Sequence, residues 1–136
     1  MLLIPSICLS AQEIARDGHF VAYENGVVKD TRTGLEWVAG PDRNITWYEA
    51  KAWVQSLNIA GGGWRMPTTD ELKTLYEKGK GTNHRTLLLK ATGNFLWSGE
   101  TKDSSSAWGF FFGWGRRTFN GRDNSRFSRA FAVRSR

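Results

Sequence analysis

The chain has 136 residues, of which 40% are hydrophobic and 13% aromatic, so it suits one packed domain and leaves little room for two. Its single cysteine, Cys8, excludes a disulfide framework within the chain and a Cys-x-x-Cys metal site. Throughout the sequence, no segment reaches the roughly 20 consecutive apolar residues that a membrane-spanning helix needs.

The net charge of +6 is concentrated near the C-terminus. Residues 113–136 contain seven arginines, no lysine and one aspartate, whereas residues 1–112 balance 12 basic with 12 acidic side chains. A local excess of this kind attracts anionic partners such as nucleic acid, an acidic or sulfated glycan, or an acidic protein surface. The alternative interpretation is a solvated face that keeps the domain soluble.

Residues 1–11 form a short apolar run followed by small residues, which resembles the end of a secretory signal cleaved near Ser10 or Ala11. Pro5 interrupts the run, and no lysine or arginine precedes it. An ordinary N-terminal strand is the alternative. We favour a truncated signal and therefore expect a secreted or cell-surface protein.

Residues 19–38 are typical of a small antiparallel meander. HFVAY (19–23) and VVKD (27–30) are β-prone runs separated by Glu24-Asn25-Gly26, where Asn-Gly favours a tight hairpin turn. Thr33-Gly34 then marks a second turn before LEWV.

Two helices follow, each introduced by a Ser/Thr-x-x-Glu capping box. Thr46 and Glu49 predict the start of the first helix, which should end near Asn58. Thr68 and Glu71 predict the start of the second. In that helix Lys78 is expected in the last turn, where the helix dipole favours a cation.

The segment 82–94 is compatible with either a short helix or a strand. From residue 95 the pattern is β-like again, through FLWS, SSSAWGFFF, WGRRTF and AFAVR. The order of strands, two helices and strands predicts a single α+β domain over residues 19–136 with a mainly antiparallel sheet.

Five blocks in this order resemble the Lcl C-terminal domain family. They are GVVKDTRTGLEWV (26–38), ITWYEAKAWVQSLN (45–58), GGGWRMPTTDEL (61–72), FLWSGETKDSSSAWGFFF (95–112) and AFAVR (130–134). The resemblance implies a C-type-lectin-like fold, in which two helices pack on a small twisted sheet and the termini pair near each other. It also implies an extracytoplasmic module that binds glycans or proteins, since some adhesins of the family bind sulfated glycosaminoglycans. The final strand lacks the cysteine often found there.

The tryptophans divide into two groups. Trp64, with Arg65 hydrogen-bonded to loop carbonyls, is expected to fill the core between the helices. Four others lie within apolar patterns and are also expected in the scaffold: Trp37, Trp53, Trp97 and Trp108. Trp47 and Trp114 stay open, because either one could face solvent and stack on a ring or a sugar.

The resemblance places the exposed binding face on the last strands and the loop between them. Arginine there offers bidentate hydrogen bonds to sulfate, phosphate or carboxylate and stacks on rings. Aromatic and small polar residues among the arginines are typical of a binding surface. The candidate ligand-binding residues are Trp114, Arg116, Arg117, Phe119, Asn120, Arg122, Asp123, Asn124, Arg126, Phe127 and Arg129.

Some relatives of the family are variable proteins of diversity-generating retroelements, which mutate adenines near the 3′ end of a gene. Asn codons altered in this way never encode Lys, Glu, Gln, Met or Trp, and residues 115–129 contain none of these five. A short run can show the same bias by chance. If the bias reflects diversification, the identity of the ligand is particular to this copy.

Signs of catalysis are sparse, so we expect neither an enzyme nor a cofactor. His19 and His84 lack a neighbouring nucleophile motif, and Asp70 and Glu71 point different ways on one helix. No metal site is expected either, since Asp123 is the only carboxylate among the arginines. The expected partner is a surface protein or an anionic glycan, not nucleic acid. The alternative is a structural or assembly domain of a surface appendage, with the arginines in an oligomer interface.

Overall fold

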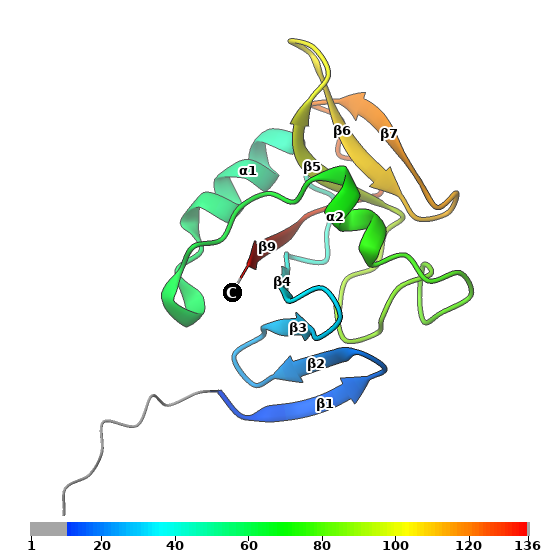
Figure 1. Ribbon diagram of the computed structural model, residues 1–136. Coiled ribbons are helices and arrows are strands. Elements are labelled where there is room, and N and C mark those ends of the chain that lie inside the picture. Colours follow the sequence, from blue (N-terminus) through cyan, green and yellow to red (C-terminus); the bar gives the residue numbers. More distant parts are fainter. Residues whose placement is uncertain (1–10, 136) are drawn as a thin grey trace, which may run out of the picture.

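The computed structural model describes residues 11–135, which form an α+β domain with two sheets and two α-helices (Figure 1). One sheet has the strand order β1-β2-β3-β4-β9 and the other the order β7-β6-β5-β8. All neighbouring strands are antiparallel except β5 and β8. The strands are β1 (Glu13–Asp17), β2 (Phe20–Tyr23), β3 (Val28–Asp30), β4 (Leu35–Ala39), β5 (Phe95–Thr101), β6 (Ser106–Phe111), β7 (Arg116–Gly121), β8 (Ser128–Arg129) and β9 (Phe131–Ser135).

The predicted meander is β2, β3 and β4, and its first turn is the tight turn expected at Asn25-Gly26. Asn25 Oδ1 accepts a hydrogen bond from the Val27 N–H, and Gly26 has a φ of 92° that a side chain would disfavour. The sheet begins earlier than residue 19, because β1 pairs with β2. Of the proposed signal segment, residues 1–11, all but Ala11 lie outside the described residues, Cys8 included.

The last strand completes the first sheet by pairing with β4, where Trp37 lies opposite Val133. The first and last strands of the described chain therefore do not pair, since β2, β3 and β4 lie between them. This corrects the expectation that the termini pair. Because the meander adds strands on one side of β4, β9 takes the other side.

Both capping boxes are confirmed, at Thr46 for α1 (Trp47–Ser56) and at Thr68 for α2 (Thr69–Thr74). The helix α2 is shorter than predicted, so Lys78 lies beyond its last turn. The Glu77 N–H donates to the His84 carbonyl instead of continuing the helix. A short 3-10 helix, η1 (Ile59–Gly61), follows α1.

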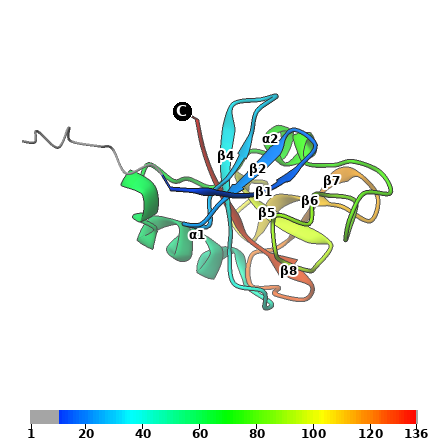
Figure 2. The ribbon, with the colours of Figure 1, turned by 90° about the horizontal axis from the view of Figure 1, so that it is seen from below.

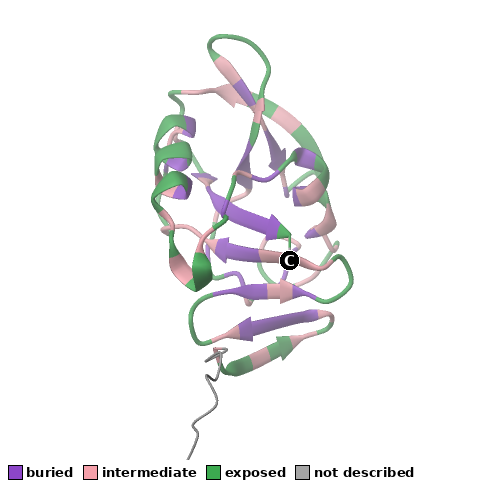
Figure 3. Cartoon of the chain, turned by 60° about the vertical axis from the view of Figure 1, so that its left-hand side comes forward, coloured by how far each residue is buried: buried purple, intermediate pink, exposed green. Residues whose placement is uncertain are grey.

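The helices cover opposite faces of the second sheet (Figures 2 and 3). On one face, Leu96 and Phe110 join the core cluster that contains Leu72 and Leu75, which lie at α2. On the other face, a second cluster surrounds Trp97. It contains Ile45, Trp47, Ala50, Phe95, Ala107 and Ala130.

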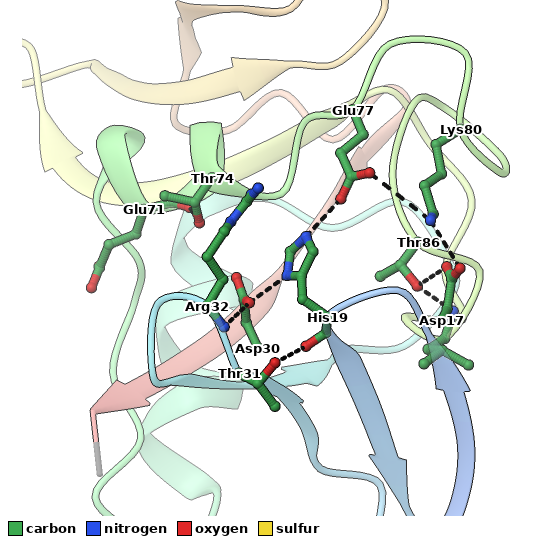
Figure 4. A network of polar contacts seen from close by, with 11 residues as sticks. Asp17, His19, Asp30, Thr31, Arg32, Glu71, Thr74, Glu77, Lys80 and Thr86 are labelled. Carbon is green, nitrogen blue, oxygen red and sulfur yellow. Dashed lines mark hydrogen bonds and ion pairs between the residues drawn. The ribbon is translucent and has the colours of Figure 1, made fainter.

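Polar contacts hold the first sheet to the segment after α2 (Figure 4). His19 Nδ1 lies 2.5 Å from Oδ1 of the buried Asp30, and its Nε2 lies 3.0 Å from Glu77 Oε1. Lys80 Nζ lies 2.9 Å from Asp17 Oδ1, and Thr86 donates to the other oxygen of Asp17. His19 is therefore part of the scaffold and faces two carboxylates.

The segment 82–94, left open between helix and strand, is neither of the two in the described chain. Arg85 organises it, because Nη2 donates to the carbonyls of Ala91 at 2.7 Å and Gly93 at 3.1 Å. Its guanidinium lies between the rings of Phe112 and Phe131, at 4.9 and 5.4 Å. Burial, assisted by the positive charge of Arg129, lowers the pKa of Arg85 to about 10.

Candidate ligand-binding surface

The hairpin of β6 and β7 carries the first part of the arginine-rich segment. Trp108 lies opposite Phe119 and Phe110 lies opposite Arg117. Side chains alternate between the two faces of a strand, so Arg117 and Phe119 share the α2 face while Arg116 belongs to the α1 face. The candidate residues of β7 are thus divided between two faces.

The α2 face carries a row of cations and rings. The guanidinium carbon of Arg117 lies 3.9 Å from the centre of the Trp108 ring, and Phe119 contacts the same indole edge-on at 5.4 Å. Lys102 Nζ, from the loop after β5, lies 4.4 Å above the Phe119 ring. Two cations therefore lie over two aromatic side chains that contact each other edge to face.

The opposite face carries a second stack at the turn between β6 and β7. Trp114 is 63% exposed and packs on Phe111, with 4.5 Å between ring centres. Arg116 lies 5.0 Å from the Trp114 ring. Asn120 lies further along the same face of β7 and is half-buried.

The loop after β7 supplies a third exposed ring. Phe127 is 60% exposed and adopts a φ of 57°, and Arg126 lies 5.3 Å from its ring. Asn124 Oδ1 accepts from the Arg126 N–H, which fixes the loop. Asp123 and Asn124 are exposed beside them.

Arg122 and Arg129 are committed to contacts within the domain. Arg122 lies over the Trp47 ring at 5.0 Å and donates to the carbonyls of Asp103 and Ser106. Arg129 forms an ion pair of 2.8 Å with Asp42 and donates to Asn44. The hydrogen bond from Arg129 is the leading reason that the pKa of Asp42 is lowered.

Arg134 is buried and is also structural. It pairs with Glu36 at 2.7 Å and donates to the carbonyls of Ala60 and Gly62. The charge excess read from the sequence is therefore only partly available to a ligand. The exposed arginines of the described segment 113–135 are Arg116, Arg117 and Arg126.

A pocket of about 200 Å³ lies between α2 and the start of β7. Phe110 and Gly115 belong to its apolar part, and one carboxylate, Asp70, accompanies three cations. The cations that border it are Lys73, Arg117 and Arg116, although the guanidinium of Arg116 lies over the Trp114 ring on the opposite face of β7. This pocket can hold a small anionic group.

The tryptophans mostly lie where the sequence placed them. Trp37, Trp97 and Trp64 are buried, and Trp64 donates to the Ile59 carbonyl at 2.9 Å. Trp53 is half-buried against the core. Trp108, also assigned to the scaffold, is half-buried and carries Arg117 on its outer side.

The two tryptophans left open divide between the two alternatives. Trp47 is buried and donates to the Ser98 carbonyl, whereas Trp114 faces solvent.

Lys73 and Lys102 border the candidate surface, and the sequence did not predict either of them. The register of the β6–β7 hairpin could have located Lys102. It places Phe119 opposite Trp108 and so brings β7 beside the loop that follows β5.

A family model, described as the Lcl C-terminal domain, matches residues 26–134. The chain belongs to the Lcl C-terminal domain family. This confirms the resemblance carried by the five sequence blocks. The Lcl C-terminal domain includes both helices and the whole candidate surface, whereas β1 and β2 precede the matched region. No curated protein matches the chain.

Two further features of the Lcl C-terminal domain bear on its chemistry. The described residues bring together no group of three His, Cys, Asp or Glu side chains that could hold a metal ion. In residues 11–135, neither helix is long and apolar enough to cross a membrane.

Proposed function

We propose that this domain is a non-enzymatic, extracytoplasmic module of C-type-lectin-like fold that binds a surface protein or an anionic glycan. One observation carries the proposal. Three large aromatic side chains are exposed in the C-terminal third, and each has a cation over its ring. The pairs are Trp114 with Arg116, Phe119 with Lys102, and Phe127 with Arg126.

These pairs fit ligand binding because the ring orders the cation and leaves its hydrogen-bond donors free. A guanidinium stacked on a ring still presents its planar donors to a sulfate or carboxylate. Within the described chain, Arg116, Arg117 and Arg126 form no ion pair with a carboxylate, whereas Arg65 pairs with Glu71 and Arg129 with Asp42. The exposed cations are therefore available to an external anion.

The lectin-like assignment is supported by the family membership and by two helices that flank a small, mainly antiparallel sheet. Diversification by a retroelement is compatible with the fold. Most of residues 115–127 lie on an edge strand and an exposed loop, where substitutions leave the core intact. The ligand would then be specific to this copy of the domain.

An assembly domain of a surface appendage is the second candidate. The exposed apolar area of Trp114 and Phe127 favours it, because such rings are enriched in protein interfaces. Sedimentation of the purified domain distinguishes the two functions. A stable oligomer whose interface covers these rings supports assembly, and a monomer supports ligand binding.

The test replaces Arg116, Arg117 and Arg126 by serine and measures binding to immobilised heparin and to poly-glutamate at several salt concentrations. Arg122 is left intact because it holds the loop after β5. The matched control replaces three exposed cations outside β6, β7 and the loop after β7, Arg32, Lys78 and Lys90, and so removes the same charge.

We expect salt-sensitive binding by the wild type and by the control variant, and strong loss in the first variant. An equal loss of binding in both variants would show that net charge alone accounts for the binding. If the wild type binds neither heparin nor poly-glutamate, the proposal of an anionic ligand is overturned.

A further inference from the structure

The strand β7 ends its sheet, because within residues 11–135 it pairs with β6 alone. Figure 1 shows β7 at the outer margin of the molecule. An edge strand presents a row of main-chain donors and acceptors to which an extended segment can add.

The register identifies which main-chain groups face outward. Just beyond the strand, the Arg122 N–H donates to the Ser105 carbonyl. In an antiparallel pair, alternate residues direct their N–H and C=O groups toward the partner strand. Counting back from Arg122, the main-chain groups of Arg117 and Phe119 face away from β6.

The side chains along this edge favour an acidic segment. Arg116 and Arg117 lie on opposite faces of β7, so adjacent residues of an added strand would each meet one guanidinium. Lys102 lies beside Phe119, and Lys73 borders the pocket at the start of β7. Asp70 lies at the start of this edge beside Lys73 and Arg117, and the exposed Asp103 and Asp123 lie toward its other end, away from Arg116 and Arg117.

Arginines on an edge strand also discourage pairing between identical strands. Two copies of β7 paired in parallel register would bring four guanidinium groups together at positions 116 and 117. The same charges that reject a second copy therefore select an extended strand of opposite charge.

We infer that the outer edge of β7 accepts an extended acidic peptide segment of a partner protein as an added strand. Main-chain hydrogen bonds to Arg117 and Phe119 hold the segment, and its carboxylates pair with Arg116 and Arg117. This inference rests on the proposed function and assigns a protein as the partner.

The probe is a capped peptide, Thr-Val-Glu-Glu-Val-Thr-Val, titrated into the isotope-labelled domain. We expect slower hydrogen exchange at the amides of Arg117 and Phe119 when the peptide is bound. An analogue with every peptide nitrogen methylated keeps the charge and loses the donors, so it should bind at least about tenfold more weakly. A Lys-Lys analogue should not bind.

The protein variant Arg116→Ser with Arg117→Ser should weaken peptide binding about tenfold, through loss of two charge-assisted contacts. The control variant, Arg32→Ser with Lys78→Ser, should bind like the wild type. Equal binding of the methylated analogue, or unchanged exchange at both amides, overturns the added strand. If heparin binds and the peptide does not, this inference fails and the proposed function stands; if neither binds, both fail.

Discussion

Arg116 and Arg117 are consecutive in the chain, but their guanidinium groups lie over different tryptophan rings, Trp114 at 5.0 Å and Trp108 at 3.9 Å. The alternation of a β-strand produces this division. A one-residue slip of β7 against β6 would exchange the two faces and separate each arginine from its ring. The register of β7 is therefore as important for this surface as the arginines themselves.

Trp64→Ala should lower the free energy of unfolding by roughly 3–5 kcal/mol, because truncation of a buried tryptophan leaves a cavity. Trp64 also donates to the Ile59 carbonyl and lies 4.2 Å from the guanidinium of Arg134. The matched control is the exposed Trp114→Ala, which should cost less than about 1 kcal/mol. Chemical denaturation of both variants measures the difference, and equal stabilities would contradict the assignment of Trp64 to the core.

Arg129→Ala should destabilise the domain by about 1–3 kcal/mol, since it removes charge-assisted hydrogen bonds to Asp42 and Asn44. Arg126→Ala should change stability by less than about 0.5 kcal/mol, because Arg126 is exposed and, among residues 11–135, its guanidinium contacts only the Phe127 ring. Thermal melts compare the two variants. A larger loss in Arg126→Ala would show that the assignments of structural and free arginine are reversed.

Glu71 makes stability depend on pH. Hydrogen bonds from Arg65 are the largest cause of its lowered pKa, and burial opposes them. Because the folded pKa lies below the unfolded value, the contribution is complete above the unfolded pKa and is lost as pH falls through the folded pKa. Glu71→Gln keeps an acceptor for the Thr68 N–H but loses the charge.

At pH 7 we expect Glu71→Gln to be less stable than the wild type by about 1–2 kcal/mol. The two unfolding free energies should converge as the pH falls through the lowered folded-state pKa of Glu71, where the wild-type carboxylate takes up its proton. Denaturation curves across this range test the expectation, with the exposed Glu24→Gln as the control. A gap that stays constant with pH would exclude the charge as its cause.

Gly115→Ala should disrupt the turn between β6 and β7. Gly115 has a φ of 67°, and an added Cβ would lie 2.6 Å from Tyr76 Cζ. Gly34→Ala is the matched control, because its φ of 78° is similarly strained while no atom lies within 4 Å of the new Cβ. We expect about 1 kcal/mol for Gly34→Ala and a clearly larger loss for Gly115→Ala. Similar losses would mean that Tyr76 moves aside.

Local signals predicted much of the secondary structure. Both capping boxes and the Asn-Gly turn have side-chain contacts that lie within a few residues, so the sequence alone reveals them. The end of α2 was predicted too late because it depends on distant groups. Glu77 leaves the helix to contact His84 and His19, and nothing in the local sequence indicates either contact.

The candidate surface was predicted in part for the same reason. Exposure of Trp114, Arg116, Arg117, Phe119, Arg126 and Phe127 follows from a polar, arginine-rich pattern. The structural roles of Arg122 and Arg129 depend on Asp103 and Asp42, which lie far away along the chain. Composition located the excess charge, but only the tertiary contacts separate arginines that are held within the domain from those that are free.

The pairing of β9 with β4 joins an early and a late segment of the chain in one sheet. During translation β4 leaves the ribosome long before β9 is made, so Trp37 and Val38 lack their partner strand for most of synthesis. Exposed strands of this kind are prone to aggregate, and non-local pairing is slow. The edge of β4 that β9 covers therefore stays unpaired in the nascent chain until residues 131–135 emerge.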